Sequence, residues 1–398
     1  MDQITIPAPA DFHVHLRQGA MSELVTPHVA LGGIKTAYVM PNLTPPITSA
    51  EQAISYKQDL QKLAPETEFL MTLYLHENML EEIEVEGKKV LRGVNEVRKA
   101  SRAGVRGEVG LEIIPQVKLI FSRSPGIKSY PRGVTTNSSS GIESYEPYYP
   151  VFKALEEEGM VLNLHGEVPS DDKENISVLN AEKHFLKHLR KLATDFPKLK
   201  IVLEHATTKE AVDCVKSLPD NVGCSITPHH LVLTIDAVPS QPFNFCKPIA
   251  KEPVDRKALL DVVASGHPRF FLGSDSAPHP IKSKIPKLPD TSVKSDSKYG
   301  DVEGAGPQPC AAGVYTSPVL LPLVAYILEK AGALDKLVGF ASTNGRAFYG
   351  LPVEKNDRPV TLRRVKGKAV PAFFKGSQEG VDIVPFMAGE ELGWEIAA

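Results

Sequence analysis

The sequence predicts an α/β fold, a (β/α)8 TIM barrel, on three observations. Short runs of β-branched and apolar residues alternate with stretches of helical periodicity, as parallel strands joined by helical crossovers do. Seven such runs and an eighth near residue 127 give the eight strands that a barrel needs. Several runs lead into a histidine or an aspartate, and functional residues of such barrels gather at the C-terminal ends of the strands.

The expected strands and helices can be placed along the chain from these patterns and from helix-capping residues. The seven runs cover residues 10–15, 35–40, 69–75, 160–165, 200–205, 222–227 and 269–273. The candidate caps are Ser49 for a helix over 50–63, Asn180 for one over 181–196, and Thr207 or Thr208 for one over 209–218.

Two regions break this rhythm. Residues 281–309 are rich in Lys, Pro, Ser, Gly and Asp, and so long a loop after the last strand predicts a lid over the active face. Residues 78–126 open with an acidic and then basic run from Glu81 to Arg92, which predicts an amphipathic surface helix. The second half of that segment is apolar from Val109 to Phe121 and carries no assignment.

Composition limits the classes of protein to which the chain can belong. Its 398 residues, 42% of them hydrophobic, can form one large barrel or two domains, and we expect a single domain over 1–398. A formal net charge of −3 offers no basic field for nucleic acid or an anionic membrane. The four cysteines form no C-x-x-C pair, which indicates a reducing compartment. With no secretory signal and no apolar run of about 20 residues, a soluble, cytoplasmic protein is expected.

The triplet His13-Val14-His15 is the first candidate for chemistry. Residues i and i+2 of a strand point to the same side, so both imidazoles would project together from one strand end. Neutral imidazole is a strong ligand for zinc-like cations. Two ordinary histidines near a flexible N-terminus are the alternative, and the triplet alone does not exclude it.

The later strands repeat this feature. His165 and His205 each end a predicted strand. A third predicted strand leads into Asp275, and His279 follows four residues later. One histidine at a strand end is usually structural, but this repetition in one barrel makes coincidence an unlikely cause. Four histidines and a carboxylate at one mouth suffice for a binuclear metal site with one bridging ligand, and such a site activates water at neutral pH.

Taken together, the motifs resemble those of dihydroorotases in the amidohydrolase superfamily, in particular the compact, monofunctional type of bacteria and fungi. They are His13-Val14-His15-Leu16-Arg17, Met40-Pro41-Asn42-Leu43, Lys128-Ser129-Tyr130-Pro131, Thr135-Thr136-Asn137-Ser138, Leu164-His165-Gly166-Glu167, Glu204-His205-Ala206-Thr207-Thr208 and Leu272-Gly273-Ser274-Asp275-Ser276-Ala277-Pro278-His279. The resemblance runs from residue 4 to about Trp394 but lapses over 78–126, which is either an insertion or retained non-coding sequence in a gene model.

The resemblance implies two zinc ions per chain and a ligand set for each. His13, His15 and Asp275 would hold one ion, and His165 and His205 the other. Lys128, carboxylated on its amine, and a hydroxide would bridge the two. The hydroxide would attack the ring amide, and Asp275 would move its proton to the departing ring nitrogen.

The resemblance also implies substrate contacts. Arg17 and Asn42 would grip the substrate carboxylate, Arg17 through its planar fork. His279 and the backbone around Ala312 would complete the pocket. Three further contacts are expected: Thr135 and Thr136 from a closing loop, and Lys247 through its backbone.

The implied activity is the reversible conversion of N-carbamoyl-L-aspartate and (S)-dihydroorotate in pyrimidine synthesis, with a homodimer as the suggested assembly. A dihydropyrimidinase or hydantoinase is the nearest rival, and Arg17 and Asn42 weigh against it because an uncharged ring needs no charged partner. A barrel that has lost its metals and serves only in interactions is the second rival. The presence of all six ligand types weighs against that one.

The bridging lysine has a competitor in Lys118, whose surroundings have the higher β-propensity, but the motif beginning at Lys128 favours Lys128. Other histidines are expected to be structural. His184 and His188 fit a solvated helix face, and the resemblance gives no metal-binding role to the pair His229 and His230. Glu167 and Glu204 flank ligand histidines and are expected to orient loops.

Overall fold

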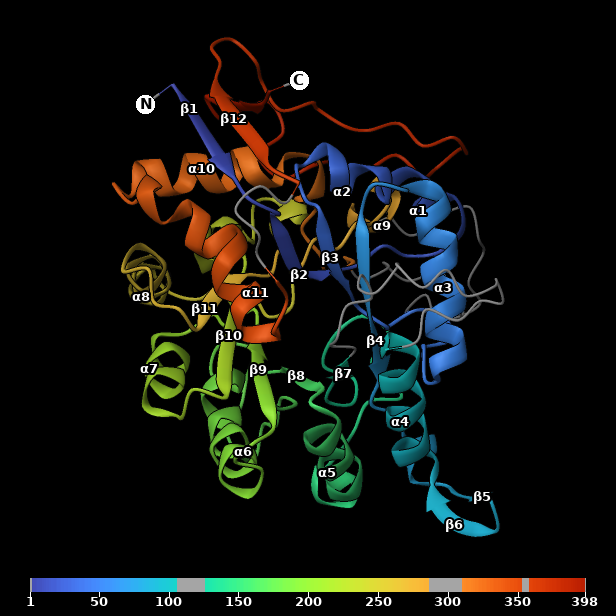
Figure 1. The fold of residues 1–398 in the computed structure, drawn as a ribbon. Coiled ribbons are helices and arrows are strands. Elements are labelled where there is room, and N and C mark those ends of the chain that lie inside the picture. The colour runs from blue at the N-terminus through green and yellow to red at the C-terminus, as the bar shows by residue number, and fades with distance from the viewer. Residues whose placement is uncertain (1, 106–125, 286–309, 353–357, 398) are drawn as a thin grey trace, which may run out of the picture.

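The computed structural model describes residues 2–105, 126–285, 310–352 and 358–397. Eight parallel strands form a barrel with helices around it, which confirms the predicted fold class (Figure 1). In order around the barrel the strands are β2(Ala10–Val14), β3(Thr36–Val39), β4(Glu68–Tyr74), β7(Gly126–Ser129), β8(Val161–His165), β9(Lys200–Glu204), β10(Val222–Ile226) and β11(Phe270–Leu272). Each lies within two residues of a predicted run.

The barrel closes between its first strand and the chain that leaves its last. Val14 forms a parallel bridge with Ser276. The amide of Asp275 donates to the carbonyl of His13 at 2.8 Å, and the amide of His15 donates to the carbonyl of Ser276 at 3.0 Å. The seam of the barrel therefore holds two candidate histidines against the candidate aspartate.

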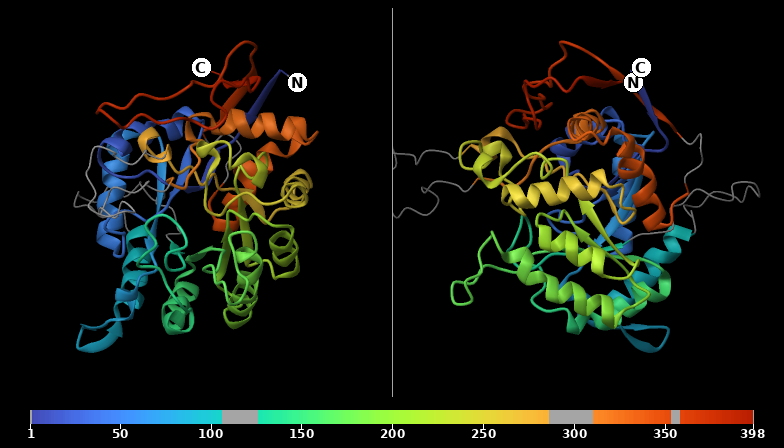
Figure 2. Two further views of the ribbon diagram at one scale, coloured as in Figure 1. Left: turned by 180° about the vertical axis from the view of Figure 1, so that it is seen from behind. Right: turned by 90° about the vertical axis from the view of Figure 1, so that its left-hand side faces the viewer.

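Helices cover the outside of the barrel and join successive strands (Figures 1 and 2). They are α1(Gly19–Val25), α2(Pro27–Leu31), α3(Ala50–Leu63), α4(Arg92–Val105), α5(Tyr149–Glu158), α6(Ala181–Asp195), α7(Lys209–Ser217), α8(Pro253–Ala264), α9(Ile281–Lys284), α10(Leu320–Lys330) and α11(Asn344–Tyr349). Ser49 caps α3 in a capping box, and Thr208 accepts from the amide of Ala211 at the start of α7. Asn180 stands at the cap of α6, but its side chain makes no capping bond to that helix.

The barrel interior below the mouth is sealed by aromatic side chains. Phe12 of β2 stacks on Tyr349 of α11 with ring centroids 4.6 Å apart. Asn163, buried in β8, donates to the hydroxyl oxygen of Tyr38 at 2.9 Å and accepts from the hydroxyl of Tyr349 at 2.8 Å. A Cβ at Gly345 would lie 2.3 Å from the ring of Phe12, so this contact requires glycine. The mouth thus has a closed floor.

The expected surface helix over the charged run is wrong. Residues 77–80 form a short 3-10 turn, and β5(Glu82–Val85) and β6(Lys88–Leu91) form an antiparallel hairpin that projects from the barrel (Figure 1). Glu86 and Gly87 have φ of 50° and 75°, as a two-residue hairpin turn demands. Helix begins only at Arg92.

α4 packs on α5 and is the crossover between β4 and β7, so this part of 78–126 belongs to the barrel. The apolar stretch from Val109 to Phe121, with Lys118, and most of the expected lid at 281–309 lie outside the described residues.

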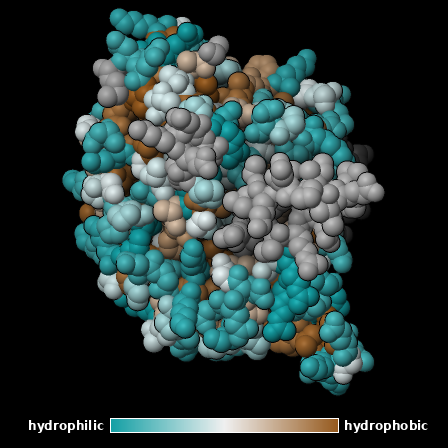
Figure 3. All heavy atoms as spheres, in the orientation of Figure 1, coloured by the Kyte–Doolittle hydropathy of each residue, from teal (hydrophilic) through white to brown (hydrophobic). Residues whose placement is uncertain are grey.

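A small antiparallel sheet lies beside the barrel and joins the two ends of the chain. It consists of β1(Gln3–Ile6), β12(Val360–Arg364) and β13(Trp394–Ile396), and both views in Figure 2 show the termini close together. The face in Figure 3 is mainly hydrophilic, with scattered apolar side chains. Within the described ranges, no helix is long and apolar enough to span a bilayer.

Candidate metal and substrate site

The six predicted metal ligands come together at the C-terminal mouth of the barrel. His13 and His15 lie at the end of β2, and each of the other four lies at the end of a different strand. All six side chains are buried: His13, His15, Lys128, His165, His205 and Asp275. The pairing register of β2 with β3 shifts between Asp11 and Val14, the interval that contains His13. His205 and Asp275 have φ of 42° and 45°, the uncommon left-handed region in which strain often accompanies function.

His13 and His15 both direct Nε2 at Asp275. Its Oδ1 lies 3.3 Å from Nε2 of His13 and 3.0 Å from Nε2 of His15. Each Nδ1 has another oxygen partner: Glu204 Oε2 at 2.9 Å from His13 and Asn42 Oδ1 at 2.8 Å from His15. If each Nδ1–H donates to its partner, each Nε2 keeps a lone pair for a metal, which is the usual arrangement of zinc-ligating histidines.

Asp275 is a carboxylate in this setting. Burial acts to raise its pKa, but the charge of His13 and hydrogen bonds from His13 and His15 hold that pKa well below its ordinary value. The pKa of His15 is also lowered, to about 4, and there burial is the main cause. An anionic oxygen beside the neutral imidazole of His15 is a good donor set for a divalent cation.

The second pair of histidines faces the first. The ring centroids of His165 and His205 lie 4.7 Å apart, and His205 is 5.1 Å from His13. His165 Nε2 lies 3.0 Å from Glu167 Oε2, which leaves Nδ1 for a ligand. His205 Nδ1 is buried without a hydrogen-bond partner in the described structure. Ligand atoms of His13, His205 and Asp275 all lie within 4.8 Å of one another.

Lys128 sits beneath these groups on β7. Its side chain is fully buried, and Nζ has no hydrogen-bond partner among the described residues. Burial lowers its pKa to about 8, against the raising effects of Glu204 and Asp275. A buried cation that has no hydrogen-bond acceptor among the described residues is costly, so the charged form of this amine is disfavoured here. The buried Lys128 Nζ and His205 Nδ1, both unpartnered, make the residues fit a metal pair.

All the predicted substrate residues except His279 line a cavity, and five of the six predicted metal ligands, all but Lys128, lie in the same wall. The predicted substrate residues in this wall are Arg17, Asn42, Thr135, Thr136, Lys247 and Ala312. Arg17 donates through Nε to the carbonyl of Pro278 at 3.0 Å, and its Nη2 lies 3.2 Å from His279 Nε2. That nitrogen is also 2.9 Å from the carbonyl oxygen of Ala312, so His279 lies between two predicted substrate contacts.

Asn42 has both ends of its amide engaged. Oδ1 faces His15, and Nδ2 donates to the carbonyl of Thr136 at 3.1 Å. Thr136 reaches across the cavity, where its hydroxyl donates to the carbonyl of Ala312 at 3.4 Å. In this structure Asn42 contacts the candidate ligand His15 and anchors the loop of Thr135 and Thr136 at the mouth. A direct grip on substrate stays a prediction.

Full-length similarity to known proteins accompanies this geometry. No family model matches the chain. A dihydroorotase of Mycosarcoma maydis is 50% identical, covering 100% of this chain and 99% of that protein. The chain belongs to the dihydroorotase family. A dihydroorotase of Saccharomyces cerevisiae is 39% identical over 100% of this chain and 98% of that protein.

A crystal structure of dihydroorotase from Saccharomyces cerevisiae, in complex with 5-fluoroorotic acid, has a TM-score of 0.81 and 38% identity. It matches 100% of this chain and 99% of that one. An L-hydantoinase of Arthrobacter aurescens, at 17% identity and a TM-score of 0.70, shares the fold. Membership of the dihydroorotase family makes the chain a cyclic amidohydrolase.

Sequence reasoning missed several contributors to this dihydroorotase-family site. Tyr130, Ala277 and Gly313 also line the cavity. Glu204 and Glu167 contact ligand histidines directly, although they were expected to orient loops. Strand alternation could have identified Glu204, because Val202, two residues earlier, faces the barrel interior and a charge on that face needs a partner.

Proposed function

We propose that this chain catalyses the reversible cyclisation of N-carbamoyl-L-aspartate to (S)-dihydroorotate and water, a step of UMP biosynthesis, with two zinc ions. The observation that carries this is the convergence of four buried histidines, Asp275 and the unpartnered Lys128 at one mouth. We also propose that one domain spans 1–398, with 281–309 as a lid, and that the protein is a cytoplasmic homodimer.

The residues divide naturally between two ions. His13, His15 and Asp275 would hold one, and His165 and His205 the other, with carboxylated Lys128 between them. The Lys128 ammonium first loses one proton; the free amine then forms a bond to the carbon of CO2 and loses a second proton, which completes the change from a cation to an anionic oxygen donor. When bound, the zinc pair supplies activation of water at neutral pH and polarisation of the amide carbonyl.

Asp275 is placed to move the proton of the reaction. In the hydrolytic direction a carbon–oxygen bond forms at the ring carbonyl and the ring carbon–nitrogen bond breaks. The Asp275 carboxylate takes the proton of the attacking water and delivers it to the departing nitrogen. Oδ1 of this carboxylate lies 3.3 Å from Nε2 of His13 and 3.0 Å from Nε2 of His15, which places it beside the atoms that would share its ion. Synthesis of the ring runs through the same steps in reverse.

Arg17 supplies the charge that a carboxylate substrate needs. Its Nε is fixed by Pro278, which aims the guanidinium at the cavity beside His279. A planar fork binds a carboxylate with two parallel hydrogen bonds. A hydantoinase acting on an uncharged ring has no use for such a group. Arg17 therefore favours dihydroorotate over dihydrouracil.

Turnover measurements test this function. Zinc-replete protein should release N-carbamoyl-L-aspartate from (S)-dihydroorotate and should leave dihydrouracil and hydantoin largely unreacted. Prolonged chelation should abolish turnover, and zinc with bicarbonate should restore it. No turnover of dihydroorotate by zinc-replete protein would overturn the assignment. Preferential turnover of dihydrouracil would establish the rival instead.

A further inference from the structure

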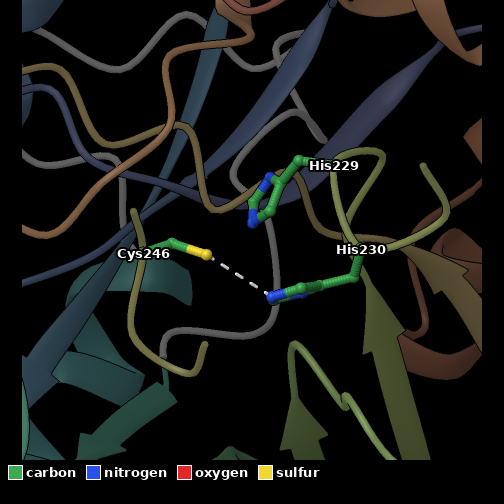
Figure 4. A group of neighbouring side chains, drawn as sticks. All are labelled: His229, His230 and Cys246. Atoms are coloured by element: carbon green, nitrogen blue, oxygen red, sulfur yellow. Dashed lines mark hydrogen bonds between the residues drawn. The ribbon is translucent and has the colours of Figure 1, made fainter. Parts of the chain in front are cut away.

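A second cluster of metal-ligating side chains lies behind the wall of the cavity. His229 and His230 follow β10, and Cys246 comes from the segment that leads into Lys247, a residue of the cavity wall (Figure 4). All three side chains are buried, and one ligand atom from each lies within 4.8 Å of the others. The residues proposed above for the zinc pair do not include any of the three.

The distance between sulfur and nitrogen suits a shared ion. Cys246 Sγ lies 3.6 Å from His230 Nε2. Zinc bonds of about 2.3 Å to sulfur and about 2.0 Å to nitrogen, at a tetrahedral angle, separate the two atoms by about 3.5 Å, close to the distance in the structure. The ligand types also select among metal ions, because thiolate and imidazole together favour zinc over magnesium or calcium.

The tautomer of His230 decides whether its Nε2 can bind. Nδ1 lies 2.8 Å from Thr227 Oγ1, and an Nδ1–H donated there leaves the Nε2 lone pair facing Cys246. Nε2 also lies 3.1 Å from the carbonyl oxygen of Pro248. The other tautomer would donate Nε2–H to that carbonyl and bind no metal, so the two arrangements exclude each other.

His229 gives an independent indication of a missing partner. Its side chain is fully buried, and neither ring nitrogen has a hydrogen-bond partner in the part of the chain that the structure describes. Buried polar atoms nearly always have a partner, so an imidazole with two unpartnered nitrogens needs an explanation. Figure 4 shows one of these nitrogens on the side of the ring that faces Cys246 and His230.

We propose that His229, His230 and Cys246 bind a third divalent ion of the zinc type, with water as the fourth ligand. Binding exchanges the thiol proton of Cys246 for a sulfur–metal bond and releases that proton to solvent. The ion fastens the end of β10 to the segment that carries Lys247. Its role is to fix part of the cavity wall, and it does not depend on the function proposed above.

Cobalt(II) is the probe that separates this ion from the pair at the mouth. The ligands proposed there offer only nitrogen and oxygen, so a thiolate-to-cobalt charge-transfer band in the near ultraviolet would report the cysteine. We expect apoprotein titrated with cobalt to develop this band and to bind three ions per chain. Cys246→Ser should lose the band and one ion, whereas Cys310→Ser, the matched control at a half-buried cysteine, should keep both.

A second variant guards against misfolding of the first. His229→Gln keeps the thiol, and we expect it to bind the third cobalt at least tenfold more weakly while its circular dichroism stays unchanged. Cobalt-loaded protein without a thiolate band, or a band unchanged in Cys246→Ser, would overturn the third site. The thiolate band and the count of bound ions decide the third site, whereas dihydroorotate turnover by the unsubstituted protein decides the proposed function, so failures of the two assignments are distinguishable.

Discussion

Three of the four candidate ligand histidines at the mouth have a ring nitrogen within hydrogen-bonding distance of a side-chain oxygen, and His205 is the exception. Glu204 contacts His13, Asn42 contacts His15 and Glu167 contacts His165. These partners select which ring nitrogen carries the proton and therefore which one is free for a metal. The metal affinity of the mouth should depend on residues that never touch the ion.

Glu204→Gln tests this dependence. The amide keeps the size of the side chain but removes the charge facing His13, so zinc at the mouth should bind about 10-fold to 100-fold more weakly. A competition titration with a chromogenic chelator measures the change. Glu210→Gln, at an exposed position in the first turn of α7, is the control and should leave zinc affinity as it is. Unchanged affinity in Glu204→Gln would show that the carboxylate serves folding alone.

Arg17→Lys tests recognition of the substrate carboxylate. The charge stays, but the bidentate fork is lost, and a hydrogen bond to a charged group is worth about 1.5–3 kcal/mol. We expect kcat/KM for dihydroorotate to fall by about 10-fold to 100-fold, with zinc content near normal. Arg132→Lys, whose parent side chain makes only partly exposed ion pairs with Glu77 and Glu143, should change little. Loss of zinc from Arg17→Lys would make Arg17 a structural residue.

At the scale of elements, the strands were predictable because buried parallel strands have short runs of β-branched and apolar residues in the sequence. All eight lie within two residues of their runs, and Ser49 and Thr208 act as caps at the predicted helix starts. The hairpin over 82–91 was missed because its alternating Glu and apolar residues were read by their charge rather than by their period of two.

The sequence predicted which side chains form the site but not the contacts between them. Motifs identify which side chains gather, whereas contacts such as that of His13 with Glu204 join strands 191 residues apart. The shift of register in β2 has no sequence signal that we can name. Neither does the engagement of both ends of the Asn42 amide, which depends on a loop from another strand.

The choice between Lys128 and Lys118 is a prediction about which element is the fourth barrel strand. β7 pairs in parallel with both β4 and β8, and it places Lys128 beside Tyr74 and Asn163 in register. We expect Lys128→Ala to abolish turnover and weaken zinc binding at the mouth, because the bridging anion is lost. Lys118→Ala, outside the described residues, should remain active. The reverse pattern would reassign the bridging ligand.

Across the whole molecule, the proposed metal ligands connect strands that are distant in sequence. They come from β2, β7, β8, β9 and the chain after β11, and the last of these meets β2 at the seam where the barrel closes. Ions bound there would crosslink the first and last strands of the barrel and stabilise its closed form. In their absence the same buried charges and unpartnered atoms oppose folding. Metal content and stability should therefore change together.

Removal of the metals should lower the Tm of the whole chain. An ion that binds only the folded state, present at a thousand times its Kd, stabilises it by about 4 kcal/mol. We expect Cys246→Ser, which isolates the mouth from the proposed third site, to hold two zinc ions and to lose several degrees of Tm after chelation. Calorimetry with elemental analysis of the same samples measures both quantities, and added zinc should restore them. A chelated, zinc-free sample with an unchanged Tm would mean that the barrel closes without its metals, and one tight ion in active protein would indicate a mononuclear site.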